Sequence, residues 1–281
     1  MASLAMTAPL GQTADSNPDT WRDSSFELRT SPFPPLTTPF YAPPDAFDGD
    51  RVRLPDDEAR HASRVLRHAV GDVVAVVDGV GGWHTVRLDR VAKDRAEGVV
   101  VETRYDAGEP ASRVIVGLAP LKSADRMAFA VEKAVELGVT DVLLLDTART
   151  EGRIPKPERL HALAVAAMKQ TLRSRLVRFH PVRQLGMAQF LADTGETFLP
   201  VLLHEAAPDD APFPTLLAQR GRSVVPLVGP EGGFTPEEVD AARLAGWPVA
   251  SLGPRRLRAE TAFVAVCALH LAARISDAGA A

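Results

Sequence analysis

Between about residue 111 and residue 277, short apolar runs alternate with longer segments of helical periodicity, and this pattern restricts the fold more than any other feature. In the segment 125–137, apolar residues recur every three or four positions before Gly138, as in an amphipathic helix. The apolar runs lie at 114–118, 142–145, 198–203, 224–228 and 249–252. Alternating strands and helices are typical of a parallel sheet covered by helices, so we predict an α/β domain over 111–277.

The first 110 residues carry two other patterns. Residues 1–39 are rich in Pro, Ser, Thr and Asp with few apolar positions, which predicts a disordered tail. Residues 40–106 contain a short helical pattern over 55–67 and several short alternating runs, which predict a small β-rich domain. These runs are 73–77, 83–88 and 98–103. The segment 105–112 has no apolar periodicity and suits a linker between independently packed units.

The composition is that of an ordinary soluble protein. Of the 281 residues, 46% are hydrophobic and 24% are charged, and no apolar run is long enough to cross a bilayer. The first residues lack the basic flank and apolar region typical of a secretion signal, and the single cysteine, Cys267, has no partner for an internal disulfide. We therefore expect a cytoplasmic protein with Cys267 packed in its core. The net charge of −4 does not exclude local basic patches.

The segment after the run 224–228 is a candidate binding loop, because ligands bind at the carboxyl ends of strands in open parallel sheets. It reads Gly-Pro-Glu-Gly-Gly, and Thr235 and Glu238 then fit the N-cap and N3 positions of a helix. Glycines let the backbone approach a ligand closely, which suits an adenine edge and a ribose. The loop lacks the Gly-Lys-Ser/Thr ending of a phosphate cradle, and Glu231 would repel a phosphate. A plain tight turn is the alternative interpretation.

A second glycine-proline loop follows the run 249–252 and contains three arginines. They are Arg255, Arg256 and Arg258. Cations before a helix start are unfavourable unless an anion lies nearby, so this placement favours a functional role. Ordinary solvated arginines, one of them paired with Glu260, are the alternative. The helix predicted over 260–273 is apolar nearly all round, so the domain core or a second subunit must cover it.

A third candidate loop follows the run 198–203 and begins with His204 and Glu205. This pair lacks the helical spacing and the further His or Cys of a zinc site. We therefore predict no metal, and a histidine at a loop edge is more often simply hydrogen-bonded.

The strongest basic stretch of the chain runs from residue 149 to residue 183. Its candidate RNA contacts are Arg153, Lys169, Arg173 and Arg175. Such a concentration of positive charge can neutralise phosphates, although a solvated helix face is an equally good interpretation. Arg64 and Arg67 in the β-rich domain form a second, weaker candidate patch.

Taken in order, several of these segments resemble the ribosomal small-subunit methyltransferase E family, the 16S rRNA uridine-N3 methyltransferases of the SPOUT superfamily. The segments that carry the resemblance are 61–72, 122–127, 132–139, 203–205, 228–234 and 252–262. The resemblance implies a small PUA-like β-barrel over 40–106 that helps to hold RNA. It further implies that the α/β domain is threaded as a trefoil knot, that its knot loops bind S-adenosylmethionine, and that the enzyme is a homodimer.

The cofactor-binding positions of the family can be carried over residue by residue. The first loop contributes Leu203, His204 and Glu205; the second contributes Val228, Gly229, Pro230, Glu231 and Gly232; the third contributes Leu252, Gly253, Leu257 and Arg258. Lys122, at the start of another matching segment, is added to the candidate RNA contacts.

The activity that the resemblance implies is methyl transfer to N3 of a uridine in 16S rRNA, either free or within the small ribosomal subunit. Loss of the N3 proton places negative charge on the uracil oxygens, and Arg258 and Arg126 are the candidates to stabilise that charge. Glu260 is a candidate orienting group or proton acceptor. A non-catalytic RNA-binding assembly factor with the same fold is the alternative. All the glycine-proline loop residues are present, which favours the enzyme.

Overall fold

The computed structural model describes residues 38–183, 198–205, 207, 212–217 and 223–278. These residues all belong to one compact unit. The predicted disordered tail over 1–39 therefore lies almost entirely outside the described residues.

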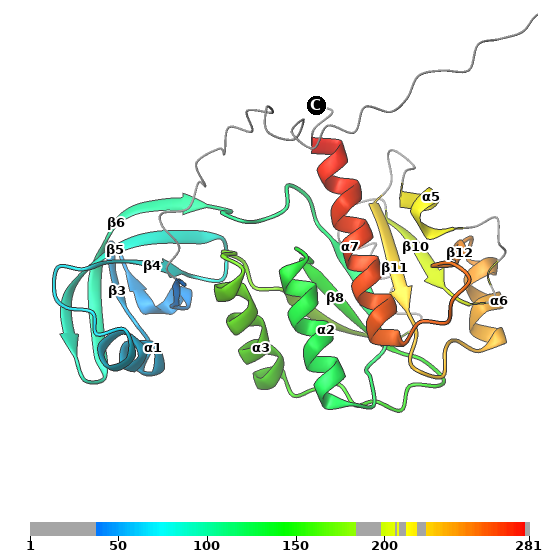
Figure 1. Cartoon of the computed structure of the whole chain (residues 1–281), viewed down its shortest axis with the longest axis horizontal. Coiled ribbons are helices and arrows are strands. Elements are labelled where there is room, and N and C mark those ends of the chain that lie inside the picture. The colour runs from blue at the N-terminus through cyan, green and yellow to red at the C-terminus, as the bar shows by residue number, and fades with distance from the viewer. Residues whose placement is uncertain (1–37, 184–197, 206, 208–211, 218–222, 279–281) are drawn as a thin grey trace, which may run out of the picture. The chain divides into compact units, whose positions relative to one another are not determined.

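The N-terminal part forms a six-stranded sheet in the order β1-β4-β5-β6-β3-β2 (Figure 1). Its strands are β1 (Phe40–Tyr41), β2 (Phe47–Asp48), β3 (Arg51–Arg53), β4 (Val73–Val77), β5 (Gly82–Ala92) and β6 (Arg95–Tyr105). β1 runs parallel to β4, and every other pairing in this sheet is antiparallel. Inward-facing residues such as Phe40, Val76 and Leu88 form a separate hydrophobic core. The three runs predicted as strands are confirmed, whereas the short strands β1, β2 and β3 are too brief to show a periodicity.

The predicted helix over 55–67 is present but irregular. A five-residue helix, α1 (Asp56–Arg60), continues into one turn of π-helix over His61–Val65. Arg67 then adopts a positive φ of 58°, a left-handed conformation that a non-glycine residue rarely takes. The turn leaves Val65 and Leu66 exposed beside Arg64 and Arg67.

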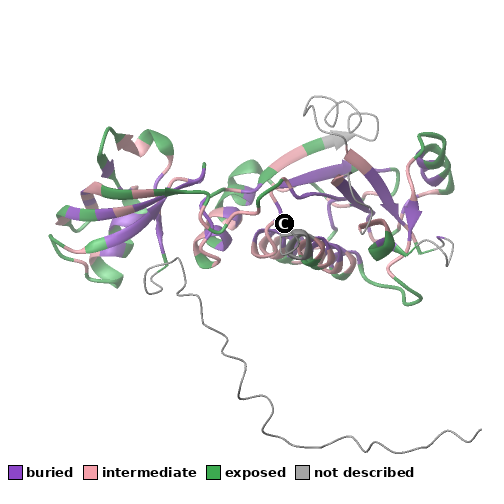
Figure 2. Cartoon of the chain, turned by 90° about the horizontal axis from the view of Figure 1, so that it is seen from above, coloured by how far each residue is buried: buried purple, intermediate pink, exposed green. Residues whose placement is uncertain are grey.

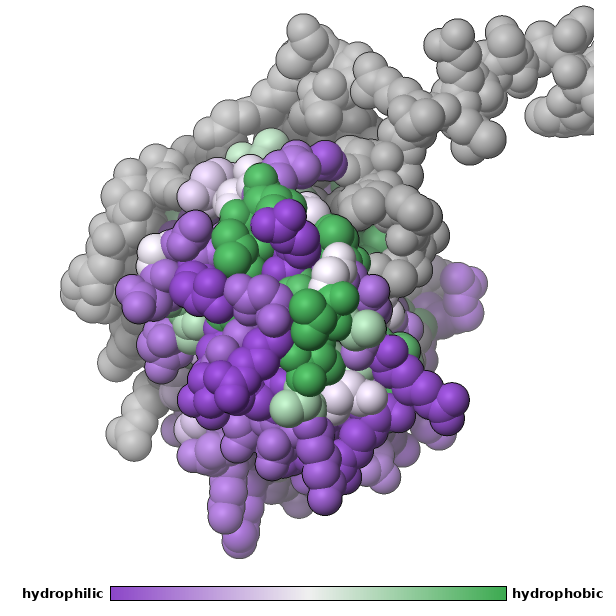
Figure 3. All heavy atoms as spheres, turned by 90° about the vertical axis from the view of Figure 1, so that its left-hand side faces the viewer, coloured by the Kyte–Doolittle hydropathy of each residue, from purple (hydrophilic) through white to green (hydrophobic). Residues whose placement is uncertain are grey.

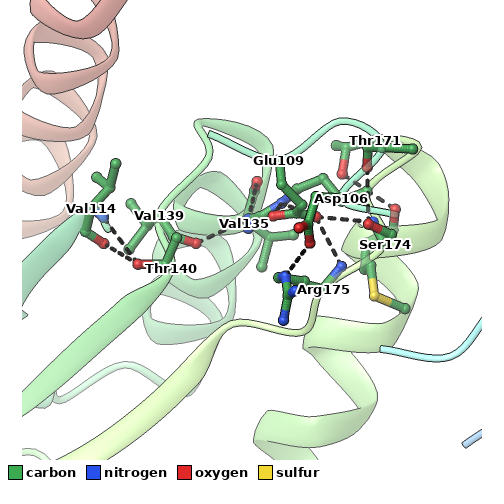
Figure 4. Close-up of polar contacts among 12 residues, drawn as sticks. Asp106, Glu109, Val114, Val135, Val139, Thr140, Thr171, Ser174 and Arg175 are labelled. Atoms are coloured by element: carbon green, nitrogen blue, oxygen red, sulfur yellow. Dashed lines mark hydrogen bonds and ion pairs between the residues drawn. The ribbon is translucent and has the colours of Figure 1, made fainter. Parts of the chain in front are cut away.

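The segment 105–112 differs from the loose linker that its composition predicts. The carboxylate of Glu109 is buried and accepts hydrogen bonds from the backbone N–H groups of Ser174 and Arg175, at 2.9 and 2.8 Å. Asp106 pairs with Arg175 at 2.5 Å, and these groups converge in Figure 4. The side chains of the segment therefore anchor it to residues 173–175 of the following α/β domain.

The C-terminal part contains a six-stranded sheet in which every pairing is parallel, in the order β12-β10-β11-β7-β8-β9. Its strands are β7 (Ile115–Leu118), β8 (Asp141–Asp146), β9 (Arg178–Arg183), β10 (Phe198–Leu203), β11 (Ser223–Val228) and β12 (Val249–Ala250). The predicted α/β class and the five predicted strands are confirmed. The trefoil knot stays a prediction. β9 was missed, because Arg178 and His180 make this edge strand look like part of the basic stretch.

Five helices accompany the parallel sheet in the described residues. They are α2 (Ala124–Glu136), α3 (Pro157–Gln170), α5 (Phe213–Leu217), α6 (Pro236–Leu244) and α7 (Ala259–Ala278). α2 packs against both α3 and α7, and α6 packs on a hydrophobic cluster that includes Leu145, Leu227 and Val239. Buried residues follow the strands and the inner helix faces (Figure 2).

The α7 helix buries one face and leaves much of the rest partly exposed. Phe263, Val266 and Cys267 are buried, which agrees with the predicted core position of the cysteine. Burial also raises the pKa of the Cys267 thiol, which keeps the thiol protonated. None of the helices in the described part of the chain is long and apolar enough to cross a membrane.

Candidate functional site

Three neighbouring strands direct their following loops to one edge of the parallel sheet. β10 lies between β12 and β11, and all three run in the same direction, so the loops after Leu203, Val228 and Ala250 leave from the same side. This is the edge at which open parallel sheets bind their ligands. The loops predicted from the sequence as separate candidates therefore form one site.

The loops surround a cavity of about 860 Å³. All twelve residues predicted to bind the cofactor line this cavity: Leu203, His204, Glu205, Val228, Gly229, Pro230, Glu231, Gly232, Leu252, Gly253, Leu257 and Arg258. Arg126 also lines it, at the start of α2, and so does Arg149, from the loop after β8. Residues up to 136 positions apart along the chain, from Arg126 to Ala262, thus meet in one concave site.

Two glycines show why small residues are needed in these loops. Gly253 has a φ of +104°, where an L side chain is strained, and no heavy atom lies within 4 Å of the position that its Cβ would occupy. A Cβ at Gly229 would lie 3.1 Å from the ring of Phe234. The glycines therefore keep the loop backbone accessible and let Phe234 pack directly beneath the second loop.

The cavity combines apolar surfaces with charges of both signs. Leucine and valine side chains from all three loops lie beside five arginines, Arg126, Arg149, Arg255, Arg256 and Arg258, and two carboxylates, Glu205 and Glu231. The Nε atom of Arg256 lies 3.2 Å from Oε2 of Glu205, which links the third loop to the first. Such a lining suits a ligand that has a flat apolar part and carries both positive and negative charge.

The three residues predicted to be catalytic come together at the start of α2 and α7. Arg126 and Arg258 line the cavity. Glu260 is buried, with Oε1 lying 3.4 Å from Nε of Arg126. Its second oxygen, Oε2, has no hydrogen-bond partner among the described residues. Glu260 therefore pairs with Arg126 rather than with Arg255, Arg256 or Arg258, which was the alternative considered for the loop arginines.

Sequence reasoning missed Arg149, which binds the second loop. Nη1 of Arg149 donates hydrogen bonds to the carbonyl oxygens of Gly232, at 2.8 Å, and Phe234, at 3.4 Å. Glu231 is held from the other side, because its Oε1 accepts a hydrogen bond from the backbone N–H of Lys122 at 3.0 Å. Only the general position of Arg149, just after a predicted strand, could have identified it.

The structure places Arg173, one of the predicted RNA contacts, inside the protein. Its side chain is only 3% exposed and forms an ion pair of 2.7 Å with Glu109, which is equally buried. Nη1 of Arg173 also donates hydrogen bonds to the carbonyl oxygens of Val135 and Val139, at 3.0 and 2.9 Å. The guanidinium is therefore fully engaged inside the protein, and a phosphate could reach it only if this core contact opened.

The other predicted RNA contacts fall into two groups. Lys169, Arg175 and Lys122 have carboxylate partners, namely Glu58, Asp106 and Glu151. Arg64, Arg67 and Arg153 are exposed, and none of the ion pairs found among the described residues involves them. The second group is thus the better placed to meet phosphates.

Family models match two parts of the chain. Residues 108–271 match an RNA methyltransferase domain, and residues 54–101 match an RNA methyltransferase PUA domain. The first match contains every residue that lines the cavity, and the second contains α1, β4, β5 and most of β6.

Individual proteins show the same similarity over most of the chain. A ribosomal RNA small subunit methyltransferase E from Synechocystis is 30% identical and aligns with 75% of this chain and 69% of its own length. The crystal structure of a probable rRNA-methyltransferase from Porphyromonas gingivalis has a TM-score of 0.75 and 32% identity, covering 85% of this chain and 99% of that one. The crystal structure of a ribosomal RNA small subunit methyltransferase E from Neisseria gonorrhoeae, bound to S-adenosyl methionine, has a TM-score of 0.67 and 29% identity, covering 83% and 96%.

Proposed function

Because this chain belongs to the ribosomal RNA small subunit methyltransferase E family, we propose that it methylates N3 of a uridine in 16S rRNA, with S-adenosylmethionine as the methyl donor. Methylation of ribosomal RNA is the function common to the family. The more specific part of the proposal is that N3 of a uridine accepts the methyl group. The observation that carries the proposal is the meeting of all three predicted cofactor loops around one cavity.

The residues of this cavity fit S-adenosylmethionine. Exposed backbone at Gly253 and the neighbouring glycines can hydrogen-bond to an adenine edge and a ribose, while Leu203, Val228 and Leu257 supply apolar surfaces for the base. Glu205 and Glu231 can balance the positive charges of the donor, and the arginines can balance its carboxylate. When bound, the donor supplies a methyl group already activated on a sulfonium.

The protein's own task is to position the uracil and to favour loss of its N3 proton. Arg126 and Arg258, on the cavity wall, can stabilise the negative charge that spreads onto the uracil oxygens. Glu260 does not line the cavity and pairs with Arg126, which favours a role as a positioning residue over a role as the proton acceptor. In this proposal the proton leaves to solvent or to a group of the bound RNA.

Arg64, Arg67 and Arg153 are the preferred RNA contacts within this proposal, and Lys122 joins them at the cavity side. Arg64 and Arg67 lie next to the exposed Val65 and Leu66, so phosphate neutralisation and apolar contact with unstacked bases can occur together. Apolar side chains also lie among hydrophilic ones on the face that Figure 3 shows. Lys169 and Arg175 are secondary candidates, because each must first leave its carboxylate partner.

A homodimer formed through α7 completes the proposal. Val264, Ala265, Leu269 and Leu271 lie outside the buried face of this helix and remain partly exposed in the single chain. A second copy related by a two-fold axis would cover these residues with the same surface. The third cofactor loop leads directly into α7, so dimerisation would also stabilise Arg258.

Two measurements test the proposed function. Calorimetry should detect binding of S-adenosylmethionine to the full-length protein, with or without a chelator. Mass spectrometry of 16S rRNA nucleosides from cells lacking the gene should show loss of one N3-methyluridine, restored by the wild-type gene. If cofactor binding fails while the chain still binds RNA, the non-catalytic assembly factor becomes the better interpretation. A different missing nucleoside would refute the N3 assignment alone.

A further inference from the structure

Arg149 connects two loops that are distant in sequence and adjacent at the carboxyl edge of the sheet. It belongs to the loop after β8, whereas the carbonyl groups that it binds, those of Gly232 and Phe234, belong to the loop after β11. Both carbonyl groups accept from the same nitrogen, Nη1. The guanidinium therefore spans the second cofactor loop where its chain turns from Gly232 toward α6.

The loop that carries Arg149 is itself firmly held. Thr147 and Thr150 close a tight turn through hydrogen bonds of 2.8 to 3.1 Å between their backbone and side-chain groups. The backbone N–H of Ala148 donates to Oε1 of Glu238 at 2.8 Å. Glu238 is also the N3 residue of the capping box of α6, where its Oε2 accepts from the N–H of Thr235. Arg149 and Glu238 thus each link the loop after β8 to the segment that runs from the loop after β11 into α6.

The aliphatic part of Arg149 also packs over Gly232. A Cβ at Gly232 would lie 3.4 Å from both Cβ and Cδ of Arg149, so the arginine stem lies beside Gly232, on the side where a side chain would project. The remaining nitrogens, Nε and Nη2, form no hydrogen bond with the described residues, and the residue lines the cavity. The side chain therefore supports the loop from the cavity side.

We infer that Arg149 is a positioning residue that holds the second cofactor loop, 229–234, in its binding conformation, an inference that rests on the proposed cofactor. A loop that is already ordered loses less conformational entropy when a ligand binds, so the contribution of Arg149 is to cofactor affinity. The charged hydrogen bonds to Gly232 and Phe234 carry this effect, and the stem adds packing. Loss of the guanidinium should therefore raise the KM for S-adenosylmethionine more than it lowers kcat.

Three variants of the full-length protein test the inference by calorimetric titration with S-adenosylmethionine. Arg149→Met keeps the stem and removes the donors, and it should raise Kd roughly tenfold, the effect of losing a charge-assisted hydrogen bond. Arg149→Lys keeps a charged donor group at the end of the stem and should recover part of that loss. Arg243→Met is the matched control, because Arg243 is exposed on α6 and pairs with Asp240 away from the cavity. Its Kd should equal that of the wild type.

Glu238→Gln gives an independent arm. An amide can accept only one of the two hydrogen bonds that the carboxylate accepts from Ala148 and Thr235. In the double variant, the effects of Glu238→Gln and Arg149→Met on Kd should be non-additive, because both residues act on the same loop. An unchanged Kd in Arg149→Met, or strict additivity, would overturn the inference. A fall in kcat at constant Kd would overturn it too, by making Arg149 a catalytic residue. Failure of the wild type to bind the cofactor would refute the proposed function instead.

Discussion

Nε of Arg126 lies 3.4 Å from Oε1 of Glu260, and this ion pair joins the first turn of α2 to the first turn of α7 at the wall of the cavity. Arg126 is partly exposed toward the cavity, whereas Glu260 is buried behind it. A buried carboxylate that faces a guanidinium fixes the direction in which the guanidinium points. The pair therefore aims a positive charge at the place where the uracil is proposed to bind.

Glu260→Gln should lower kcat for methylation about tenfold, because Arg126 loses the charge that orients it. The affinity for S-adenosylmethionine should change by less than about twofold, since Glu260 does not line the cavity. Single-turnover methylation and calorimetry measure the two effects separately. Glu158→Gln, an exposed carboxylate on α3, is the control. A loss of about a thousandfold together with a flattened pH–rate profile would instead identify Glu260 as the proton acceptor.

The site could be predicted from the sequence because its residues follow strands and carry local signals. Thr235 and Glu238 form the capping box that their spacing predicts, and the glycine-proline loops meet at one edge because parallel strands end there. Arg149 and Arg173 show the limit of this reasoning. An arginine in a basic stretch can face solvent, a loop carbonyl or a buried glutamate, depending on partners tens of residues away. The local spacing of residues does not indicate which of these partners it will meet.

The dependence on partners distant in sequence also explains why a cluster at the amino ends of the parallel strands could not be predicted. Asp141 has a fully buried side chain that pairs with Arg113, Arg178 and His180. In the sequence it is one acidic residue at the start of an apolar run. Its partners come from two other strands: Arg113 precedes β7, and both Arg178 and His180 belong to the missed strand β9.

Asp141→Asn should lower the free energy of unfolding at neutral pH by about 2–4 kcal/mol, because two arginines lose the carboxylate that they share. Burial alone would raise the pKa of Asp141, but hydrogen bonds from His180, Arg113, Arg178 and Thr140 outweigh burial and hold its pKa well below the usual range. The contribution to stability is therefore present above the unfolded-state pKa of about 3.9 and is lost as the pH falls further, toward the folded-state pKa. Urea unfolding should show the difference between variant and wild type shrinking as the pH falls from about 5 to about 2.5.

Arg173→Ala should destabilise the protein by about 3–5 kcal/mol, because it leaves the Glu109 carboxylate buried without its ion-pair partner. The part of the protein that remains folded should bind RNA with an unchanged salt dependence. Thermal unfolding and RNA titrations at several salt concentrations measure both quantities. A normal melting temperature combined with a weaker salt dependence would restore Arg173 as an RNA contact.

Arg64→Ala should leave the stability of the protein unchanged and weaken the salt dependence of RNA binding. Its side chain is exposed, so stability should change by less than about 0.5 kcal/mol. Loss of one phosphate contact should reduce the slope of log K against log salt by about 0.7 to 0.9. Arg104→Ala provides a matched control, since Arg104 is a half-exposed arginine of the same domain that pairs with Glu102. Equal salt slopes for Arg64→Ala and the wild type would leave this surface without a role in RNA binding.

Ala268→Glu tests the proposed dimer, because Ala268 is exposed on α7 in the single chain, next to the buried Cys267. In a monomer the new carboxylate would face water, and the free energy of unfolding should change by less than about 0.5 kcal/mol. In a dimer across α7 it would be buried without a partner and should dissociate the subunits.

Sedimentation at micromolar concentration should therefore give a dimer mass for the wild type and a monomer mass for the variant. Ala241→Glu, a change at an exposed alanine on α6, should remain dimeric. The dissociated variant should also lose methylation activity, since the third cofactor loop leads into α7. A wild-type monomer with full activity would contradict both the interface and its link to catalysis.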